Sequence, residues 1–345
     1  MPAAQELWFN GHRTNEWVTL IYHPYPSPLR VRGEHASSAG SQPHAHNIIT
    51  AAMSVAFPTV ALIGKYKTPE VAEPVMRLAR FLETRGVKVL LDRLTAAHIQ
   101  NCPYEVLLLE DLGREADLAI VIGGDGTMLN IARTFAPYDV ALVGINQGRL
   151  GFLTDISLDT MFETITAILD GQFVTEERML FESEVWSGSN GAQERVFEVL
   201  AFNDVVVAKG FKGGLVDIEV RIDGQFIYNQ RSDGLIVATP TGSTAYAFSS
   251  GGPIVHPSLS VMTLVPVSPH TLSNRPIVIS ANSVVEIVVC SADDPRAHFD
   301  SHSHFDLRED DRVVVRRYPH QIKLLHPVGH SYYAMLREKL HWNRD

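Results

Sequence analysis

The segment from Asp117 to Leu129 constrains the fold of this chain more than any other. It starts as an apolar run with β-branched residues, which predicts a buried strand over 117–122. Five residues then form a polar turn: Gly123, Gly124, Asp125, Gly126 and Thr127. The sequence predicts a helix over 128–136 directly afterwards. A strand that ends in such a turn lies at the carboxyl edge of a sheet, where open α/β proteins bind their ligands.

The residue types in this turn suit a bound phosphate. Glycine has no Cβ, so backbone N–H groups can approach a phosphate closely and the chain can adopt positive φ. The helix N-terminus adds a partial positive charge and free N–H donors. The negative charge of Asp125 repels a phosphate, unless the carboxylate works with a bridging Mg²⁺ or activates a hydroxyl. The pattern predicts phosphoryl chemistry, and a tight turn that uses Gly-Asp-Gly for geometry alone is the alternative.

The composition is that of a globular protein of about two domains, with 345 residues, 45% of them hydrophobic. The formal net charge of −10 argues against general nucleic-acid binding. Cys102 and Cys290 form no metal or redox motif, which favours reduced thiols and a cytoplasmic protein. Because no apolar run reaches membrane-spanning length, we expect no membrane association.

Residues 1–55 differ from the rest of the chain. They hold scattered prolines, glycines, serines and histidines without a persistent helical or strand period, so we expect a flexible arm. Met53 stands just before the first clear strand. A second hypothesis is therefore that the native protein starts at Met53.

Strands and helices alternate over residues 56–157. The expected strands are 58–64, 87–91, 117–122 and 140–145, and the expected helices are 70–85 and 128–136. Alternation at these lengths implies a parallel sheet with right-handed crossovers, hence a Rossmann-like α/β domain. The loop Asn146–Asp155 follows a strand in the same domain, so we expect it to line the same crevice, although a simple connector is the alternative. A further helix is predicted over 158–169.

Strands dominate residues 158–329, which predicts a second domain built as a β-sandwich. The clearest signal is a hairpin over 216–228 around Asp223-Gly224. Further strands are expected over 284–289 and 312–316. The histidines of the run 298–304 are interpreted as alternating along one strand rather than as a metal site. A helix within 330–345 is expected to return to the first domain.

A second polar cluster interrupts the β region. A short strand feeds a glycine-rich turn and a short helix between Arg231 and Pro253. Tyr246 can stack on a base and hydrogen-bond through its hydroxyl. Upstream, Asn203 can recognise an adenine edge by donating and accepting together. Arg149 and Arg231 are candidate anion clamps by charge, with a structural ion pair as the alternative for each.

Together these motifs resemble those of the bacterial NAD kinase family. The motifs that carry the resemblance are Gly123–Gly126, Asn146–Thr154, Asn203-Asp204, Ser232–Gly252 and Pro269–Pro276. They extend from about Pro58 to the C-terminus in the family's order. The Gly-Gly-Asp-Gly-Thr turn alone is shared with diacylglycerol-type lipid kinases and phosphofructokinases, whereas the segment Thr239–Tyr246 is much more specific. Asp204 replaces the family's usual glutamate, and Asp300-Ser301 replaces an Asp-Gly pair.

The resemblance implies transfer of the γ-phosphoryl group of ATP to the 2′-hydroxyl of the adenosine ribose of NAD, giving NADP and ADP. It implies a divalent metal, Mg²⁺ or Mn²⁺, held by the ATP phosphates, with Asp125 as a candidate further ligand, and a homodimer or homotetramer. Asp125 would be the catalytic carboxylate. The phosphate-binding residues would be Gly123, Gly124, Gly126 and Thr127, with Arg149 added by its charge. The NAD-binding residues would be Gly126, Asn203, Asp204, Asp233, Thr244, Ala245, Tyr246 and Ser249, with Arg231 added by its charge.

Two alternatives remain. A lipid kinase could share the Gly-Gly-Asp-Gly-Thr turn, but it would favour basic patches for an acidic membrane. A non-catalytic nucleotide sensor could keep the binding residues without turnover.

Overall fold

The computed structural model describes residues 56–148, 150–188, 193–210, 213–271 and 273–342. The predicted arm of residues 1–55, with Met53, lies outside the described residues, and so does Arg149. All statements below concern the described residues.

A parallel sheet forms the first part of the fold. Its strands are β1 (Thr59–Gly64), β2 (Lys88–Asp92), β3 (Glu105–Leu107), β4 (Leu118–Gly123) and β5 (Ala141–Asn146). They lie side by side in the order β5-β4-β1-β2-β3, and every pair is parallel. All six residues of β4 and of β5 are buried, as expected for a sheet covered on both faces. The predicted α/β fold is confirmed.

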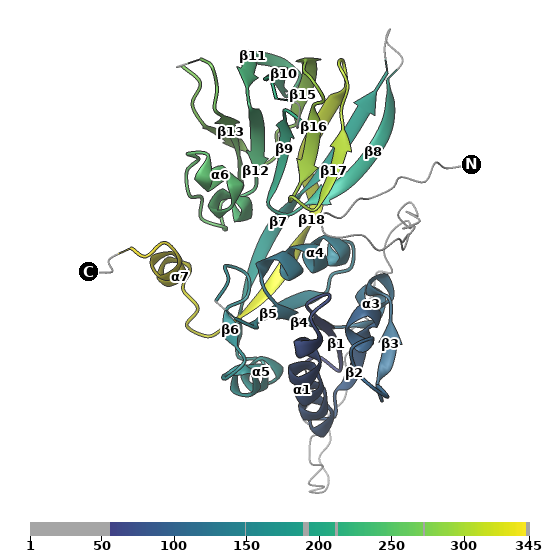
Figure 1. Cartoon of the computed structure of the whole chain (residues 1–345). Coiled ribbons are helices and arrows are strands. Elements are labelled where there is room, and N and C mark those ends of the chain that lie inside the picture. Colours follow the sequence, from purple (N-terminus) through teal and green to yellow (C-terminus); the bar gives the residue numbers. More distant parts are fainter. Residues whose placement is uncertain (1–55, 149, 189–192, 211–212, 272, 343–345) are drawn as a thin grey trace, which may run out of the picture. The chain divides into compact units, whose positions relative to one another are not determined.

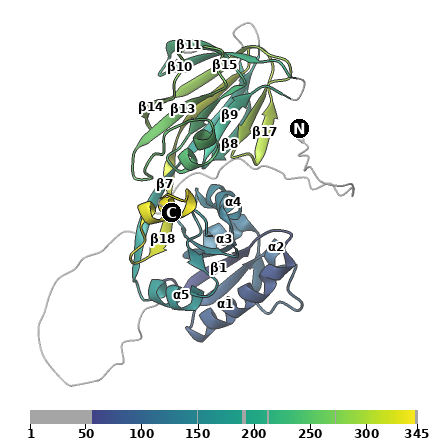
Figure 2. The same ribbon diagram turned by 60° about the vertical axis from the view of Figure 1, so that its left-hand side comes forward.

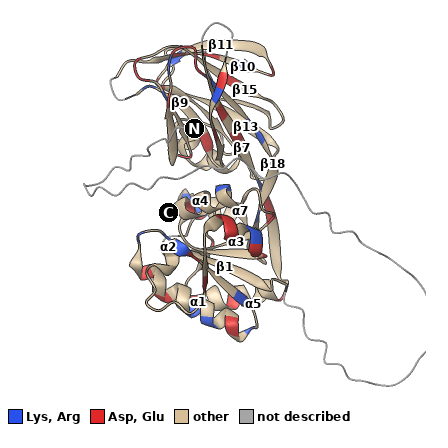
Figure 3. Cartoon of the chain, turned by 90° about the vertical axis from the view of Figure 1, so that its right-hand side faces the viewer, with Lys and Arg blue, Asp and Glu red and all other residues tan. Residues whose placement is uncertain are grey.

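Helices cover both faces of this sheet. They are α1 (Ala72–Thr84), α2 (Arg93–Ala96), α3 (Leu109–Glu115), α4 (Asp125–Phe135) and α5 (Met161–Leu169). Leu62 of β1 packs in one core with Leu78 of α1 and Ile165 of α5. Its neighbour Ile63 packs in a second core with Phe135 of α4, because successive strand residues point to opposite faces. Acidic and basic residues are interspersed along the helices (Figure 3).

The second part is a β-sandwich, as predicted. One sheet has the order β14-β13-β12-β9-β16-β17, and its strands are β9 (Asp204–Ala208), β12 (Gly234–Ala238), β13 (Val261–Val267), β14 (Ile277–Ser280), β16 (Arg296–Phe299) and β17 (Ser303–Asp306). The facing strands are β7 (Phe173–Ser187), β8 (Glu194–Ala201), β10 (Val216–Ile222), β11 (Gln225–Ser232), β15 (Val285–Ser291) and β18 (Arg312–Pro327). Figure 2 shows the two layers, and the core between them contains Phe181, Val237 and Phe299. The predicted hairpin is β10–β11, where Asp223 and Gly224 both have positive φ.

Two long strands belong to both parts of the fold (Figure 1). Strand β18 pairs with β15 through Val313 and Ile287, and eleven residues later it pairs with β5 through Leu324 and Leu142. Strand β7 follows β18 in antiparallel register along its whole length. Together with the short strand β6 (Ile156–Ser157), which pairs with β5, the parallel sheet and one layer of the sandwich therefore form one continuous 12-stranded sheet. Of strand β18 the sequence predicted only residues 312–316, because an irregularity between Arg317 and Gln321 interrupts the alternation of side chains along the strand.

Two further expectations about local structure were wrong. Helix α4 begins at Asp125 and not at Met128, so the polar turn is the first turn of the helix. The histidine run is not one strand: Asp300 and Ser301 have positive φ and form a turn between β16 and β17. His298 and His304 are cross-strand partners, whereas His302 lies at the turn.

The last helix, α7 (Tyr332–Lys339), begins after Ser331, whose hydroxyl accepts a hydrogen bond from the Ala334 N–H. The Tyr332 hydroxyl donates to the Val255 carbonyl, and the Lys339 ammonium lies 5.9 Å from the centre of the Phe152 ring. The predicted domain limits at 157 and 329 remain a prediction. Among the described residues, no helix combines the length and the apolar character needed to cross a membrane.

A buried ion pair joins the two parts of the fold. Arg133 of α4 donates to Asp300 at 3.0 Å, and their side chains are 10% and 0% exposed. Asp300 also accepts hydrogen bonds from the backbone N–H groups of Phe202, Asn203 and Asp204. Removal of one partner of such a pair leaves a buried charge without its counterion.

We therefore expect Arg133→Ala to lower the free energy of unfolding by roughly 3–5 kcal/mol. The matched control is Arg77→Ala on α1, whose ion pair with Glu73 is exposed, and its effect should stay below about 1 kcal/mol. Urea unfolding followed by circular dichroism measures both. Equal shifts for the two variants would show that the buried pair does not stabilise the fold.

Candidate active site

The order of the parallel strands locates the most favourable ligand position. The chain runs from β1 outward through β2 and β3, then returns to the other side of β1 for β4 and β5. The connections that leave β1 and β4 therefore diverge at this point of the sheet. Ligands of open α/β proteins bind outside the carboxyl ends of the strands at such a switch point. The polar turn predicted as a phosphate site follows β4.

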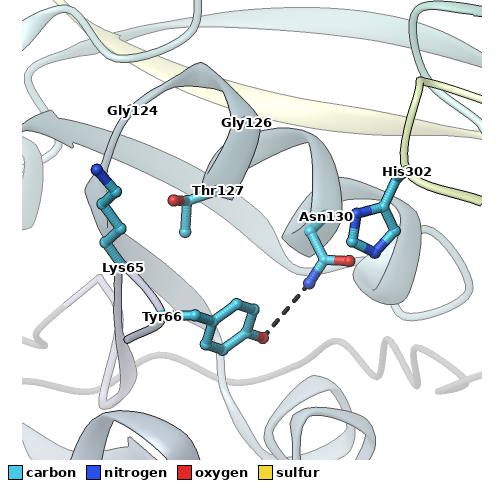
Figure 4. Close-up of a pocket in the computed structure, with 7 residues that line it drawn as sticks. All are labelled: Lys65, Tyr66, Gly124, Gly126, Thr127, Asn130 and His302. Atoms are coloured by element: carbon cyan, nitrogen blue, oxygen red, sulfur yellow. Dashed lines mark hydrogen bonds between the residues drawn. The ribbon is translucent and has the colours of Figure 1, made fainter. Parts of the chain in front are cut away.

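A pocket lies at this position (Figure 4). Its volume is about 390 Å³, and its lining residues are Lys65, Tyr66, Gly124, Gly126, Thr127, Asn130 and His302. Lys65 and Tyr66 directly follow β1, and the next four come from the start of α4. The Asn130 side-chain amide donates to the Tyr66 hydroxyl at 3.4 Å. His302 reaches the pocket from the β16–β17 turn, so both parts of the fold contribute.

The start of α4 offers hydrogen-bond donors to this pocket. Within the described chain, the backbone N–H groups of Asp125 and Gly126 have no acceptor. Such groups, together with the helix dipole, attract anions. None of the three glycines in this turn has a positive φ, so what they contribute is the absence of a Cβ. A Cβ on Gly124 or Gly126 would meet no protein atom within 4 Å, so the missing side chains leave open space beside the pocket.

The following loop fixes the carboxylate of Asp125. One oxygen accepts the N–H of Phe152 at 2.8 Å, and the other accepts the N–H of Leu153 at 3.0 Å. The Thr154 hydroxyl donates to the second oxygen at 3.3 Å. A Cβ on Gly151 would lie 2.0 Å from the Asp125 carboxylate, so only glycine fits there. The two glycine-bearing loops therefore do meet, and the second one orients the aspartate of the first.

The predicted adenosine-binding pair, Asn203 and Asp204, lies at the turn between β8 and β9. The Asp300 carboxylate holds this turn by accepting three backbone N–H groups. The Arg133 side chain, which pairs with Asp300, also donates to the Asn130 side chain of the pocket at 3.2 Å. A chain of hydrogen bonds thus connects the pocket to the Asn203 turn.

The Asp204 side chain is 3% exposed, and within the described chain it has no hydrogen-bond donor. Burial, together with the nearby negative charge of Asp300, raises its pKa to about 7. The carboxyl group is therefore protonated much more readily than an ordinary aspartate. A protonated carboxyl group can donate a hydrogen bond, which an ionised one cannot.

The glycine-rich segment of the sandwich forms two short helical turns, η2 (Thr241–Thr244) and α6 (Tyr246–Ser249). The hydroxyl of Thr239 and that of Ser243 bond to the backbone within and beside this segment, which fixes its shape. The Tyr246 ring is 44% exposed, so its face is accessible. The contacts predicted for Thr244, Ala245, Tyr246 and Ser249 remain predictions.

Two predicted residues are ion-paired on the sandwich. Asp233 bonds to Lys209 at 2.7 Å, which lowers the pKa of the Asp233 carboxyl group. Arg231 lies 3.6 Å from Asp217 in an exposed pair, which is the structural alternative stated for it above. Within the described chain, no hydrogen bond or ion pair links either residue to Asp125.

The structure therefore brings Gly124, Gly126 and Thr127 into one pocket, whereas Asp125, between the two glycines in the chain, is not one of its lining residues. Sequence reasoning missed four lining residues: Lys65, Tyr66, Asn130 and His302. Lys65 and Tyr66 could have been found, because they follow a predicted strand of the same parallel sheet. Nothing in the local sequence distinguishes Asn130 or His302. Burial raises the pKa of the Tyr66 hydroxyl, so this group stays protonated as a donor.

A parallel sheet with an anion-binding helix start at its switch point, joined to a β-sandwich, defines a phosphate-binding α/β protein. Family models identify it further. The ATP-NAD kinase N-terminal domain matches residues 60–173, and the ATP-NAD kinase C-terminal domain matches residues 202–327. The chain belongs to the NAD kinase family.

Individual relatives agree with this assignment. The chain is 60% identical to the NAD kinase of Nitrosomonas europaea over 84% of its own length and 97% of that protein. It is 58% identical to the NAD kinase of Nitrosospira multiformis over 84% and 98% of the two chains. The crystal structure of yeast NADH kinase complexed with NADH has the same fold, with a TM-score of 0.76 and 24% identity, over 83% and 88% of the chains. An NAD kinase from Archaeoglobus fulgidus in complex with ATP matches with a TM-score of 0.62 and 26% identity, over 82% and 98%.

Gly151→Ala should displace the Asp125 carboxylate, because the added methyl group would overlap it. We expect kcat for NAD phosphorylation to fall by at least about 10-fold, since small displacements of a reacting group slow catalysis strongly. Gly148→Ala is the control from the same loop, because its Cβ meets nothing closer than 3.9 Å. Steady-state kinetics with both variants test this, and an unimpaired Gly151→Ala enzyme would contradict it.

Asp204→Asn should change the pH dependence of stability. An unfolded aspartate has a pKa near 3.8, whereas the folded value is about 7. Between these values the folded state keeps a proton that the unfolded state has released, so wild-type stability falls as the pH rises through this window. Asparagine cannot ionise, so the variant should be more stable than wild type above pH 7, by on the order of 1–3 kcal/mol.

The higher stability of Asp204→Asn should vanish near pH 4. Urea unfolding at pH 4, 6 and 8 measures the difference in free energy of unfolding between variant and wild type, with Asp159→Asn at an exposed position as the control. A difference between variant and wild type that is constant across these pH values would refute the raised pKa.

Proposed function

We propose that this chain transfers the γ-phosphoryl group of ATP to the 2′-hydroxyl of the adenosine ribose of NAD, giving NADP and ADP. The observation that supports this most is the position of Asp125. Its carboxylate is fixed at the start of α4, beside backbone donors that can bind a phosphate. A carboxylate at a phosphate site is useful when a hydroxyl must be deprotonated or a metal must be held.

Positioning and charge stabilisation dominate phosphoryl transfer. In the proposed reaction, the ribose hydroxyl approaches Asp125, whose oxygens are held by Phe152 and Leu153. Asp125 accepts the hydroxyl proton as the new O–P bond forms. The N–H groups at the start of α4 stabilise negative charge on the transferred group. Lys65, which lines the same pocket, adds a positive charge.

The residues fit a divalent metal, Mg²⁺ or Mn²⁺, that arrives with ATP. Mg²⁺ is commonly bound through one or two carboxylates and the substrate phosphates rather than by an all-protein cage. Asp125 is the carboxylate beside the pocket, and its oxygens keep lone pairs besides those that accept N–H groups. The bound metal would neutralise charge on the phosphates.

NAD would be recognised by the sandwich. Asn203 and Asp204 suit hydrogen bonds to the adenosine, with Asp204 able to donate when protonated. The exposed ring of Tyr246 suits stacking on the adenine, next to Thr244, Ala245 and Ser249. Asp233 would serve the nicotinamide end, and Arg231 keeps its assignment as an anion clamp. Gly123, Gly126 and Thr127 complete the phosphate-binding turn, and Arg149 keeps its assignment as an anion clamp.

We further propose a homodimer or homotetramer in the cytoplasm. Phe226 and Ile227 are 57% and 40% exposed on β11, an edge strand of the large sheet. Exposed apolar residues on an edge strand favour association. The two alternatives, a lipid kinase and a non-catalytic sensor, are less favoured, because both family models and the relatives are NAD kinases.

Asp125→Ala should lower kcat by about 10²–10⁴-fold if the carboxylate acts as the general base. The assay supplies NAD and Mg-ATP to the purified protein and detects NADP with an NADP-specific dehydrogenase. Removal of the metal with a chelator should abolish NADP formation in the wild type. The KM for NAD should change less than kcat, because the carboxylate acts mainly in the transition state.

Asp111→Asn is the matched control, since this aspartate forms an exposed pair on α3. Its kinetics should equal those of the wild type. NADP formation by Asp125→Ala at more than about a tenth of the wild-type rate would remove Asp125 from the mechanism. A folded wild type that binds NAD without making NADP would favour the sensor.

A further inference from the structure

A buried polar cluster lies outside the pocket and has no part in the proposed reaction. Its members come from four places in the chain: Asp155 after the loop that holds Asp125, Glu176 and Arg178 on β7, His326 near the end of β18, and His330 before α7. The side chains of His326 and Arg178 are 2% and 3% exposed. Charged groups buried this deeply require specific partners.

The contacts define where the protons are. His326 Nδ1 and His330 Nδ1 each lie 2.8 Å from the same oxygen of Asp155. A carboxylate oxygen only accepts, so both Nδ1 atoms carry hydrogens. The other nitrogen of His326 lies 3.2 Å from Glu176, an ion-pair distance without hydrogen-bond geometry. His326 therefore lies between two carboxylates, which favour its charged form, and Arg178 lies 2.8 Å from Glu176 and balances the second negative charge.

Electrostatics agree with this assignment. Burial opposes the charge on His326, but the hydrogen bond to Asp155 and the nearby negative charge of Glu176 outweigh it and raise the His326 pKa. Burial also opposes the charge on Asp155, yet its two histidine partners lower the Asp155 pKa to about 2. The groups that face His326 are Asp155, Glu176 and His330, with Arg178 and the Tyr332 hydroxyl behind Glu176.

The geometry argues against a metal ion in this cluster. Ligand atoms of Asp155, His326 and His330 lie within 4.8 Å of one another. However, the two imidazole rings stack with centres 3.9 Å apart and planes only 17° from parallel. Both Nδ1 atoms face one Asp155 oxygen at 2.8 Å, so hydrogen bonds account for this arrangement without an ion.

The cluster connects two segments that the proposed function uses. At one end, Asp155 directly follows Phe152–Thr154, whose N–H and hydroxyl groups hold Asp125. At the other end, the Arg178 guanidinium donates to the Thr241 hydroxyl at 3.1 Å. Thr241 opens the η2 turn, which leads directly into the segment Thr244–Ser249 proposed to contact adenine.

We propose that His326 is a positioning residue for phosphoryl transfer. Its contact with Asp155 holds the loop Phe152–Thr154, which orients Asp125, and its contact with Glu176 links that loop to the turn at Thr241. The proposal rests on the proposed function for its catalytic consequence. His326 itself does not contact the substrate in this proposal. The network holds while His326 is charged, below its pKa, and weakens as the pH rises through that pKa.

Two substitutions separate the two contacts of His326. In His326→Asn the amide nitrogen can replace Nδ1, so the bond to Asp155 is kept. In His326→Gln the amide nitrogen can replace Nε2, so the contact with Glu176 is kept. We expect His326→Gln to lower kcat by about 10–100-fold, because the loop Phe152–Thr154 loses the support of the bond to Asp155. His326→Asn should keep kcat within about threefold and should lose the fall of kcat that wild type shows at alkaline pH.

The control is His320→Asn on the same strand, at an exposed position, and it should match wild type in kcat and in pH profile. A purely stabilising role of His326 would lower the melting temperature and leave kcat per folded enzyme and its pH profile unchanged. That outcome would overturn the proposal. Stoichiometric stabilisation by Zn²⁺ that His326→Asn abolishes would also overturn it, in favour of a metal site.

Hydrogen–deuterium exchange tests the network without any activity. His326→Gln should speed exchange of the Phe152 and Leu153 amides, His326→Asn should speed exchange of the segment 241–249, and His320→Asn should change neither. If wild type makes no NADP but exchange changes in both segments, the proposed function fails and the network stands. If wild type makes NADP and exchange changes in neither segment, the network fails alone.

Discussion

The Asp300 carboxylate has no exposed surface, and four donors surround it: the Arg133 guanidinium and the N–H groups of three successive residues, 202–204. A buried anion is tolerated only when donors and counterions replace its lost water. The turn between β16 and β17, the start of β9 and helix α4 must therefore meet at one place. Because α4 begins with Asp125, this single interaction relates the proposed catalytic carboxylate to the proposed adenosine-binding turn.

The continuous sheet supplies the second constraint. Strands β7 and β18 pair with each other from the sandwich to the parallel sheet, so the two parts of the fold cannot separate without breaking strand hydrogen bonds. The pocket and the buried cluster both lie where segments from the two parts converge. His302 enters the pocket from the sandwich, and Arg178 reaches from β7 to Thr241.

The charge state and the hydrogen bonding of each carboxylate in this chain depend on the groups around it. Asp155 has two histidine partners, and its pKa is about 2. Asp204 has no donor within the described chain and a neighbouring anion, and its pKa is about 7. Asp125 is held by two N–H groups and a hydroxyl, which fix its direction. One residue type thus serves as a structural anion, as a group that donates when protonated and as the proposed base.

The sequence by itself determined the strands and helices with a strong period and the α/β and β-sandwich parts, and it predicted the Gly-Gly-Asp-Gly-Thr turn as a phosphate site. These depend on local patterns of apolar residues and glycines. Only the tertiary structure decided that Gly151 must accommodate Asp125, that His302 enters the pocket, and that His326 joins Asp155 to Glu176. The physical reason is that these contacts join residues far apart in the chain, and local periodicity carries no information about which distant side chains share one buried space.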